Sequence, residues 1–171
     1  EHFDYGLTFE LKGNTDKALE YFKRAVDCDP DFAEAYNKLG DIYMKKARYT
    51  EAIEAYIKSA VLKSDIENTH FDLGCAYLQT ARLDEAEKEF KTALELDPHH
   101  YEIYGKLGAL CIEKKEYEQA LGFMHKMLVA DPTAVAARYY NGLALYFMGK
   151  KAAASTEFRE VISRYSALIK I

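Results

Sequence analysis

The sequence contains no tryptophan, only three cysteines and three prolines, and no apolar run long enough to span a membrane. A helix that crosses a bilayer needs about 20 consecutive, mostly apolar residues, so we expect no transmembrane segment. Cys28, Cys75 and Cys111 lie far apart and form no C-x-x-C pair, which predicts reduced, packed thiols. We therefore expect a cytoplasmic protein, or one held at the cytosolic side of a membrane through a partner.

Signatures of catalysis are missing as well. The chain has no Gly-rich phosphate loop, no G-x-S-x-G elbow and no H-E-x-x-H helix. The acidic run Glu85 to Glu89 is predicted to face solvent, and the pair His99 and His100 to form an exposed turn with too few ligands for a metal. These absences predict a protein that is not an enzyme and that binds no cofactor and no metal.

What the sequence does contain is internal repetition with a period of 34 residues and no insertion. One glycine recurs in five copies, and one alanine recurs in the same phase. The two series are Gly6, Gly40, Gly74, Gly108, Gly142 and Ala18, Ala52, Ala86, Ala120, Ala154. Such a period predicts one supersecondary unit copied five times. With the glycine numbered position 8 and the alanine position 20, we expect the two to face each other and let neighbouring helices approach closely.

Apolar spacing within a unit predicts two helices of about 12 to 14 residues. One apolar stripe uses positions 4, 7, 8 and 11, and the other uses positions 20, 24, 27 and 28. Lys12–Asn14 and Met148–Lys150 supply breaks between the helices, and Asp-Pro pairs such as Asp29-Pro30 end the second helix. His70 occupies position 4 and is predicted to be packed rather than catalytic.

The residues that recur at each numbered position, here called the columns, resemble the signature of the tetratricopeptide repeat family. The second unit carries Leu39-Gly40, Tyr43, Ala52 and Tyr56 at the family's signature positions, whereas the fifth departs from the pattern at Asn141. The resemblance implies an all-α fold, a right-handed superhelix of antiparallel helix hairpins. It predicts one domain over residues 1–171, with repeats at 1–32, 33–66, 67–100, 101–134 and 135–168. We expect this chain to be a fragment of a longer protein.

In this family the first helices of successive repeats line a concave groove, which positions 2, 5, 6, 9, 12 and 13 enter. The resemblance therefore implies a protein or peptide partner, bound by a selection of these residues. They are Asn37, Asp41, Met44, Asn68, Phe71, Asp72, Lys106, Ile112, Tyr139, Tyr140, Leu143 and Tyr146. The aromatic end of this set is either a ligand site or a surface covered by residues 165–171 or by a sixth repeat.

One known ligand class of the family can be tested against these columns. The co-chaperones that hold a chaperone's C-terminal carboxylate use five set positions, which hold two Lys, two Asn and one Arg. Here those positions hold acids and amides together with one lysine, namely Asn37, Asp41, Asp72, Glu102 and Lys106. Because convergent positive charge is missing, we expect no binding of chaperone tails.

Charge is distributed unevenly along the chain. The first repeat has eight acidic and four basic residues, whereas residues 135–171 have six basic and two acidic residues. The small basic excess predicts no nucleic-acid binding, but it complements a second copy head to tail, with Arg159 and Arg164 as contact residues. We expect a non-catalytic interaction scaffold that binds a partner, with self-assembly as a second mechanism; the alternative is a regulatory or targeting domain of a larger enzyme.

Overall fold

The structure is a computed structural model that describes residues 1–63 and 68–169. Most of these residues lie in helices, and no strand occurs among them. The helices are α1 (His2–Leu11), α2 (Thr15–Cys28), α3 (Ala33–Lys45), α4 (Tyr49–Leu62), α5 (Thr69–Gln79), α6 (Leu83–Leu96), α7 (Tyr101–Glu113), α8 (Tyr117–Ala130), α9 (Val135–Phe147) and α10 (Lys151–Ile169). The predicted repeat boundary between residues 66 and 67 lies outside the described residues.

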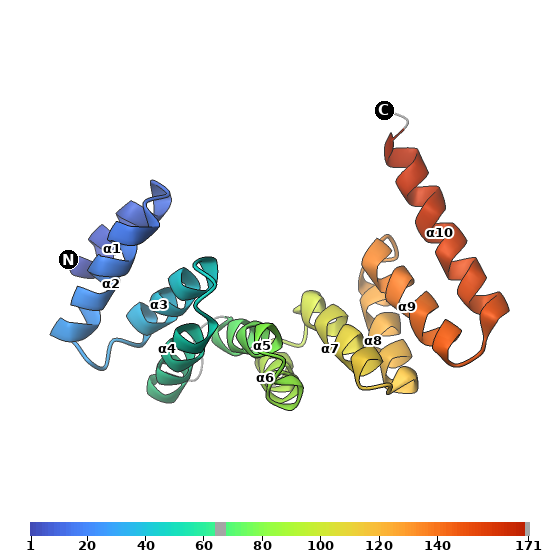
Figure 1. The fold of residues 1–171 in the computed structure, drawn as a ribbon, viewed down its shortest axis with the longest axis horizontal. Coiled ribbons are helices and arrows are strands. Elements are labelled where there is room, and N and C mark those ends of the chain that lie inside the picture. The colour runs from blue at the N-terminus through green and yellow to red at the C-terminus, as the bar shows by residue number, and fades with distance from the viewer. Residues whose placement is uncertain (64–67, 170–171) are drawn as a thin grey trace. The chain divides into compact units, whose positions relative to one another are not determined.

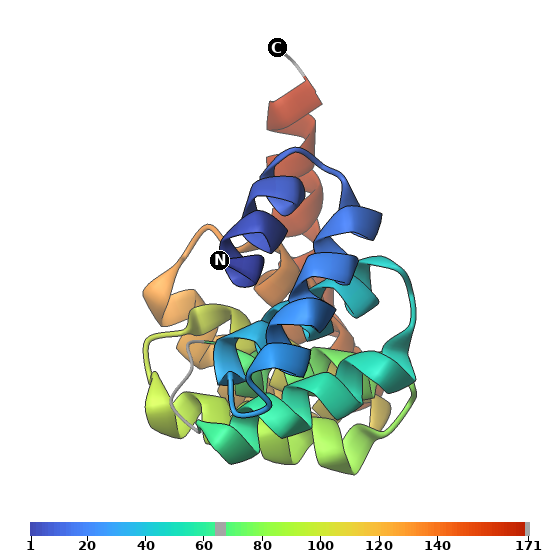
Figure 2. The same ribbon diagram turned by 90° about the vertical axis from the view of Figure 1, so that its left-hand side faces the viewer.

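Consecutive helices pair into hairpins, from α1 with α2 to α9 with α10 (Figure 1). The chain forms two compact units, residues 1–96 and residues 97–171. In the first unit, α2 packs on α3 and α4 packs on α5, so that three hairpins stack in chain order. Figure 2 views α1 and α2 from the end of that stack. In the second unit, α8 and α7 pack on α9. The predicted all-α solenoid of helix hairpins is confirmed.

Each hairpin is closed by a contact between the position-8 glycine and the large side chain at position 24. A Cβ added to Gly74 would lie 2.7 Å from Phe90 Cε1, and one added to Gly142 would lie 2.7 Å from Phe158 Cε1. The atoms nearest to these glycines therefore belong to position 24, and at Gly108 an added Cβ also lies 3.6 Å from the backbone oxygen of Ala120, the position-20 alanine. Both columns are small, but the ring at position 24 needs the space above the glycine.

Between the two helices of each hairpin, one residue at position 15 adopts the left-handed backbone conformation. Gly13 and Gly149 have φ values of 72° and 78°, and Ala47, Ala81 and Lys115 have values of 55°, 57° and 63°. The turn therefore has the same backbone conformation in all five hairpins, although only two of them place glycine there. This explains why the glycine signal for the break is visible only at the first and last repeats.

The second helices end where the Asp-Pro pairs predict, at Cys28, Leu96 and Ala130. In each of these turns, the aspartate side chain accepts a hydrogen bond from the backbone N–H two residues later, as Asp131 Oδ1 does from Thr133 N at 2.8 Å. The hydrogen bond from the Thr133 hydroxyl, followed by the one from its backbone N–H, lowers the pKa of Asp131.

Two local predictions are wrong. Helix α10 has 19 residues, and α1 and α5 have 10 and 11, rather than 12 to 14. Ser166 at position 32 permits α10 to continue but does not cause it to, since α4 ends at Leu62 although its repeat also has serine, Ser64, at that position. Cys28 is exposed rather than packed, since it occupies the last turn of α2; Cys75 is half-buried and Cys111 is buried, and none of the three forms a disulfide. No helix within residues 1–63 and 68–169 has both the length and the apolar character needed to cross a membrane.

Candidate functional site

The first unit contains an open groove of about 430 Å³. Helices α1, α3 and α5, the first helices of three successive repeats, supply its walls together with Asn68, the residue before α5. The lining residues are Phe3, Leu7, Glu34, Asn37, Lys38, Asp41, Asn68 and Asp72. Two apolar side chains of α1 therefore face a polar surface built by the next two repeats.

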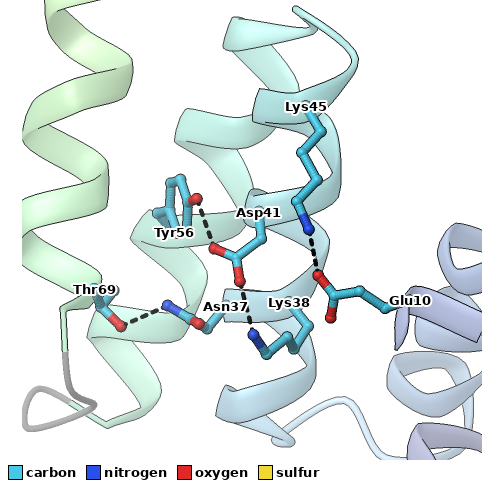
Figure 3. A network of polar contacts seen from close by, with 7 residues as sticks. All are labelled: Glu10, Asn37, Lys38, Asp41, Lys45, Tyr56 and Thr69. Atoms are coloured by element: carbon cyan, nitrogen blue, oxygen red, sulfur yellow. Dashed lines mark hydrogen bonds and ion pairs between the residues drawn. The ribbon is translucent and has the colours of Figure 1, made fainter. Parts of the chain in front are cut away.

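Asp41 is fixed by two hydrogen bonds. Its Oδ1 accepts from the Tyr56 hydroxyl at 2.9 Å, and its Oδ2 accepts from Lys38 Nζ at 2.9 Å (Figure 3). Tyr56 is the buried ring of position 24 in the same hairpin, with 2% of its surface exposed. Burial, followed by the charge of Asp41, raises the pKa of Tyr56 well above its ordinary value, so that the hydroxyl stays a donor.

Asn37 joins two neighbouring repeats. Its side-chain Nδ2 donates a hydrogen bond of 2.9 Å to Thr69 Oγ1, the first residue of α5 (Figure 3). Both residues are buried, with 9% and 1% of their surfaces exposed. A buried hydrogen bond of this kind fixes the amide orientation, because breaking it would leave polar groups without partners.

Lys38 is the basic group at the centre of the groove. Burial alone would lower its pKa, but the hydrogen bond from Lys38 to Asp41 and the negative charges of Asp41, Glu10 and Asp72 outweigh burial and raise it. Nearby, Lys45 pairs with Glu10 of the preceding repeat (Figure 3), and Glu34 pairs with Lys63 at 3.0 Å. The lining itself has three carboxylates against one ammonium group, so the groove is acidic.

Four of the predicted site residues meet in this groove, namely Asn37, Asp41, Asn68 and Asp72. Two others in the same unit do not line it. Met44 is half-buried, and the ring of Phe71 lies 5.9 Å from that of Phe90 within its own hairpin.

The remaining predicted residues belong to the second unit. Lys106 pairs with Glu102 at 3.7 Å, and Ile112 packs against the buried cluster of Cys111, Ala120 and Ala144. Leu143 is half-buried.

The tyrosines of α9 lie at two hollows on the last hairpin. Tyr139 and Tyr140 line one of about 420 Å³ together with Val161 and Tyr165, and Tyr146 lines another of about 360 Å³ together with Arg159. Tyr140 also packs against the core cluster that contains Met124 and Ala137. Arg164 lines neither hollow and lies 3.9 Å from Glu160.

Sequence reasoning missed the contribution of the first repeat to the groove. Phe3, Leu7 and Glu10 occupy positions 5, 9 and 12 of that repeat, so the columns used for the later repeats would have found them. No sequence signal identifies Tyr56 and Thr69 as partners of groove residues, since Tyr56 occupies an ordinary core position and Thr69 occupies position 3, which belongs neither to the apolar stripes nor to the groove positions.

The prediction that the acidic residues Glu85 to Glu89 of α6 all face solvent is wrong. Glu87 and Glu89 are not solvent-facing, because only 15% of each side chain is exposed. Glu87 pairs with Lys91, and Glu89 Oε2 lies 2.7 Å from His70 Nδ1. The histidine at position 4 is packed, as predicted, and its polar ring attracts an acid from the facing helix. Within the described parts of the chain, no three His, Cys, Asp or Glu side chains gather in a way that could hold a metal ion.

Comparison with known families covers most of the chain. Family models described as "TPR repeat" and "Tetratricopeptide repeat" match residues 6–47, 31–99 and 77–146. The chain belongs to the tetratricopeptide repeat family. The match agrees with the 34-residue period and with the hairpins seen in both units.

Individual proteins show the same similarity. Anaphase-promoting complex subunit 3 of Schizosaccharomyces pombe is 26% identical over 140 residues, which are 82% of this chain and 21% of that protein. This chain thus spans about a fifth of that relative.

Among solved structures, the crystal structure of MamA is 25% identical, with a TM-score of 0.91 and 97% of each chain covered. YrrB, described as a TPR protein with an unusual peptide-binding site, is 19% identical, with a TM-score of 0.88 over 95% of this chain and 84% of its own.

Proposed function

We propose that this tetratricopeptide repeat chain is a non-catalytic interaction scaffold that binds a peptide or helix of a partner protein in the groove of residues 1–96. The observation that carries this proposal is the fixed polar network of the groove. Asn37 and Asp41 are held by Thr69 and Tyr56 before any ligand arrives. Groups that are already ordered lose little conformational entropy on binding, so such a surface favours association.

The composition of the groove suggests the chemistry of the ligand. Glu34, Asp41 and Asp72 favour a segment with a basic residue, and the amides of Asn37 and Asn68 can hydrogen-bond a peptide backbone. Phe3 and Leu7 offer apolar surface for one neighbouring side chain. The description of YrrB as peptide-binding supports a peptide as the ligand class, on the strength of the shared fold.

The proposal can be tested by selection from a displayed library of random peptides, followed by fluorescence polarisation with the selected peptides. We expect selected peptides to share one pattern, a basic residue near an apolar residue. Asp72→Ala should weaken their binding at least about tenfold, equivalent to about 1.4 kcal/mol. Glu54→Ala, a matched loss of one exposed acid on α4, should leave binding unchanged.

Two results would overturn the proposal. One is a selection that yields no shared pattern. The other is a set of peptides whose affinity is the same for Asp72→Ala and for the unmodified chain.

A further inference from the structure

One face of the last hairpin is more exposed than the same face of every other repeat. At positions 5, 12 and 28, the side chains of the first four repeats are half-buried or buried. In the fifth repeat the same positions hold Tyr139, Tyr146 and Ile162, with 45%, 52% and 63% of their surfaces exposed. We call this surface the terminal face; it also includes Lys151, Phe158, Arg159, Val161 and Tyr165, which line its two hollows.

The preceding repeat shows what this face normally contacts. There, Tyr117 stacks on Phe147 of α9 with ring centroids 5.5 Å apart, and Leu121 packs against the cluster that contains Ala144 of α9. Leu128 packs against the cluster of Ala137. The usual occupant of the face is therefore the first helix of another repeat.

Helix α10 does not lead the chain back over the terminal face. The other four second helices end at position 30 of their repeats, at Cys28, Leu62, Leu96 and Ala130, and the chain then turns. α10 continues as helix for five further residues to Ile169 (Figure 1). Tyr165, within this continuation, forms part of a hollow rather than a cover for it.

Helix α1 presents the matching surface at the start of the first unit. At position 7, Leu39, Leu73 and Leu107 are buried, with 5%, 3% and 0% of their surfaces exposed, whereas Tyr5 at the same position is 47% exposed. Leu11 is 89% exposed, and it corresponds to Phe147, which stacks on the preceding repeat. The side of α1 that would contact a preceding repeat is thus uncovered.

We propose that the terminal face of one copy of this chain binds α1 of a second copy, so that the repeat array continues from molecule to molecule. Charge favours pairing of the terminal face with α1 over pairing of two terminal faces, because the first repeat is rich in acidic residues while residues 135–171 are rich in basic residues. Such a head-to-tail contact leaves one free face at each end and does not close by itself. It uses positions 7 and 13 of α1, whereas the groove uses positions 5 and 9, so it is independent of the proposed peptide binding.

Sedimentation velocity of the 171-residue chain over a wide concentration range tests the proposal. We expect the sedimentation coefficient to rise with concentration beyond that of a dimer, and to rise less at high ionic strength because salt screens the attraction. Ile162→Glu on the terminal face and Leu11→Lys on α1 should each abolish the association. Val129→Glu, a similarly exposed apolar position on α8 (70%), should not.

A mixture of the two variants gives the decisive result. Each variant keeps one working face, so each should be monomeric alone, while Ile162→Glu mixed with Leu11→Lys should form a 1:1 dimer and nothing larger. Circular dichroism melts should show that both variants fold.

Three outcomes would overturn the proposal: an unmodified chain that stays monomeric at all concentrations, a mixture of folded variants that does not associate, or a Leu11→Lys variant that dimerises alone. The last outcome would mean that two terminal faces pair with each other.

Discussion

At the scale of single residues, the most constrained contact is the one between glycine at position 8 and the side chain at position 24. It occurs in all five hairpins, with Phe22, Tyr56, Phe90, Met124 and Phe158 over the respective glycines. The first four of these side chains are buried almost completely. The position-8 glycine is therefore required by the position-24 side chain that lies against it, and any side chain at position 8 displaces that partner.

Gly74→Ala should lower the free energy of unfolding by about 1 to 3 kcal/mol, because the new Cβ would lie 2.7 Å from Phe90 Cε1. Gly122→Ala provides the control. Gly122 lies in α8 with nothing within 4 Å of an added Cβ, so alanine should stabilise by roughly 0.5 to 1 kcal/mol. Urea unfolding of both variants measures the difference, and a Gly74→Ala protein as stable as the unmodified chain would contradict the steric argument.

Tyr56→Phe should lower stability near pH 7 by about 1 kcal/mol, through loss of one hydrogen bond to Asp41. Phe22 and Phe90 at the same position show that the ring itself fits. Because burial raises the pKa of folded Tyr56 above its ordinary 10.0, the stabilisation by the hydroxyl is complete below pH 10. It is lost as the pH rises toward the higher folded pKa.

The stability difference between the unmodified chain and Tyr56→Phe should therefore shrink above about pH 10. Urea unfolding of the two proteins side by side at pH 8 and at about pH 11 measures it. Lys38 and Tyr77 also have raised pKa values. They occur in both proteins, so their contributions to the pH dependence of stability largely cancel in the difference. A difference that stays constant over this range would contradict the assignment.

At the scale of the element, the turn inside each hairpin is set by one left-handed residue at position 15. An L-residue with a side chain pays about 1 to 2 kcal/mol for this conformation, and glycine avoids that penalty at a smaller entropic loss. Ala47, Ala81 and Lys115 therefore carry strain that Gly13 and Gly149 do not.

Exchanging the two residue types should change stability in opposite directions. We expect Ala81→Gly to raise the free energy of unfolding by roughly 0.5 to 1 kcal/mol, since exposed Ala81 loses no packing. Gly149→Ala should lower it by a similar amount. Thermal and urea unfolding of both single variants checks this, and a change of the same sign in both would show that the left-handed conformation is not the deciding factor.

At the scale of the whole molecule, the repeat fold could be predicted almost completely from the sequence. Equivalent positions carry similar residues in every repeat, because each repeat contacts its neighbours through the same positions. This pattern can be recognised from the sequence alone. The length of α10 was mispredicted because a missing proline only permits a helix to continue. The prediction of one domain over residues 1–171 stays a prediction, and the structure describes two compact units.

The groove could be predicted only in part. The columns place Asn37, Asp41, Asn68 and Asp72 on one surface, but they do not reveal which side chains bond to each other. Asn37 bonds across a repeat boundary and Asp41 bonds into the core of its own hairpin. These pairings depend on side-chain rotamers and on the offset between repeats, which a one-dimensional pattern does not contain.

The closing contact of each hairpin also bears on how such a chain can change over generations. Glycine and its partner at position 24 lie within one 34-residue period, so each hairpin carries both halves of its own closure. Recombination that removes or duplicates one whole period would keep every closure intact and every column in phase. Changes in length by whole periods should therefore be tolerated far better than the insertion of a single residue.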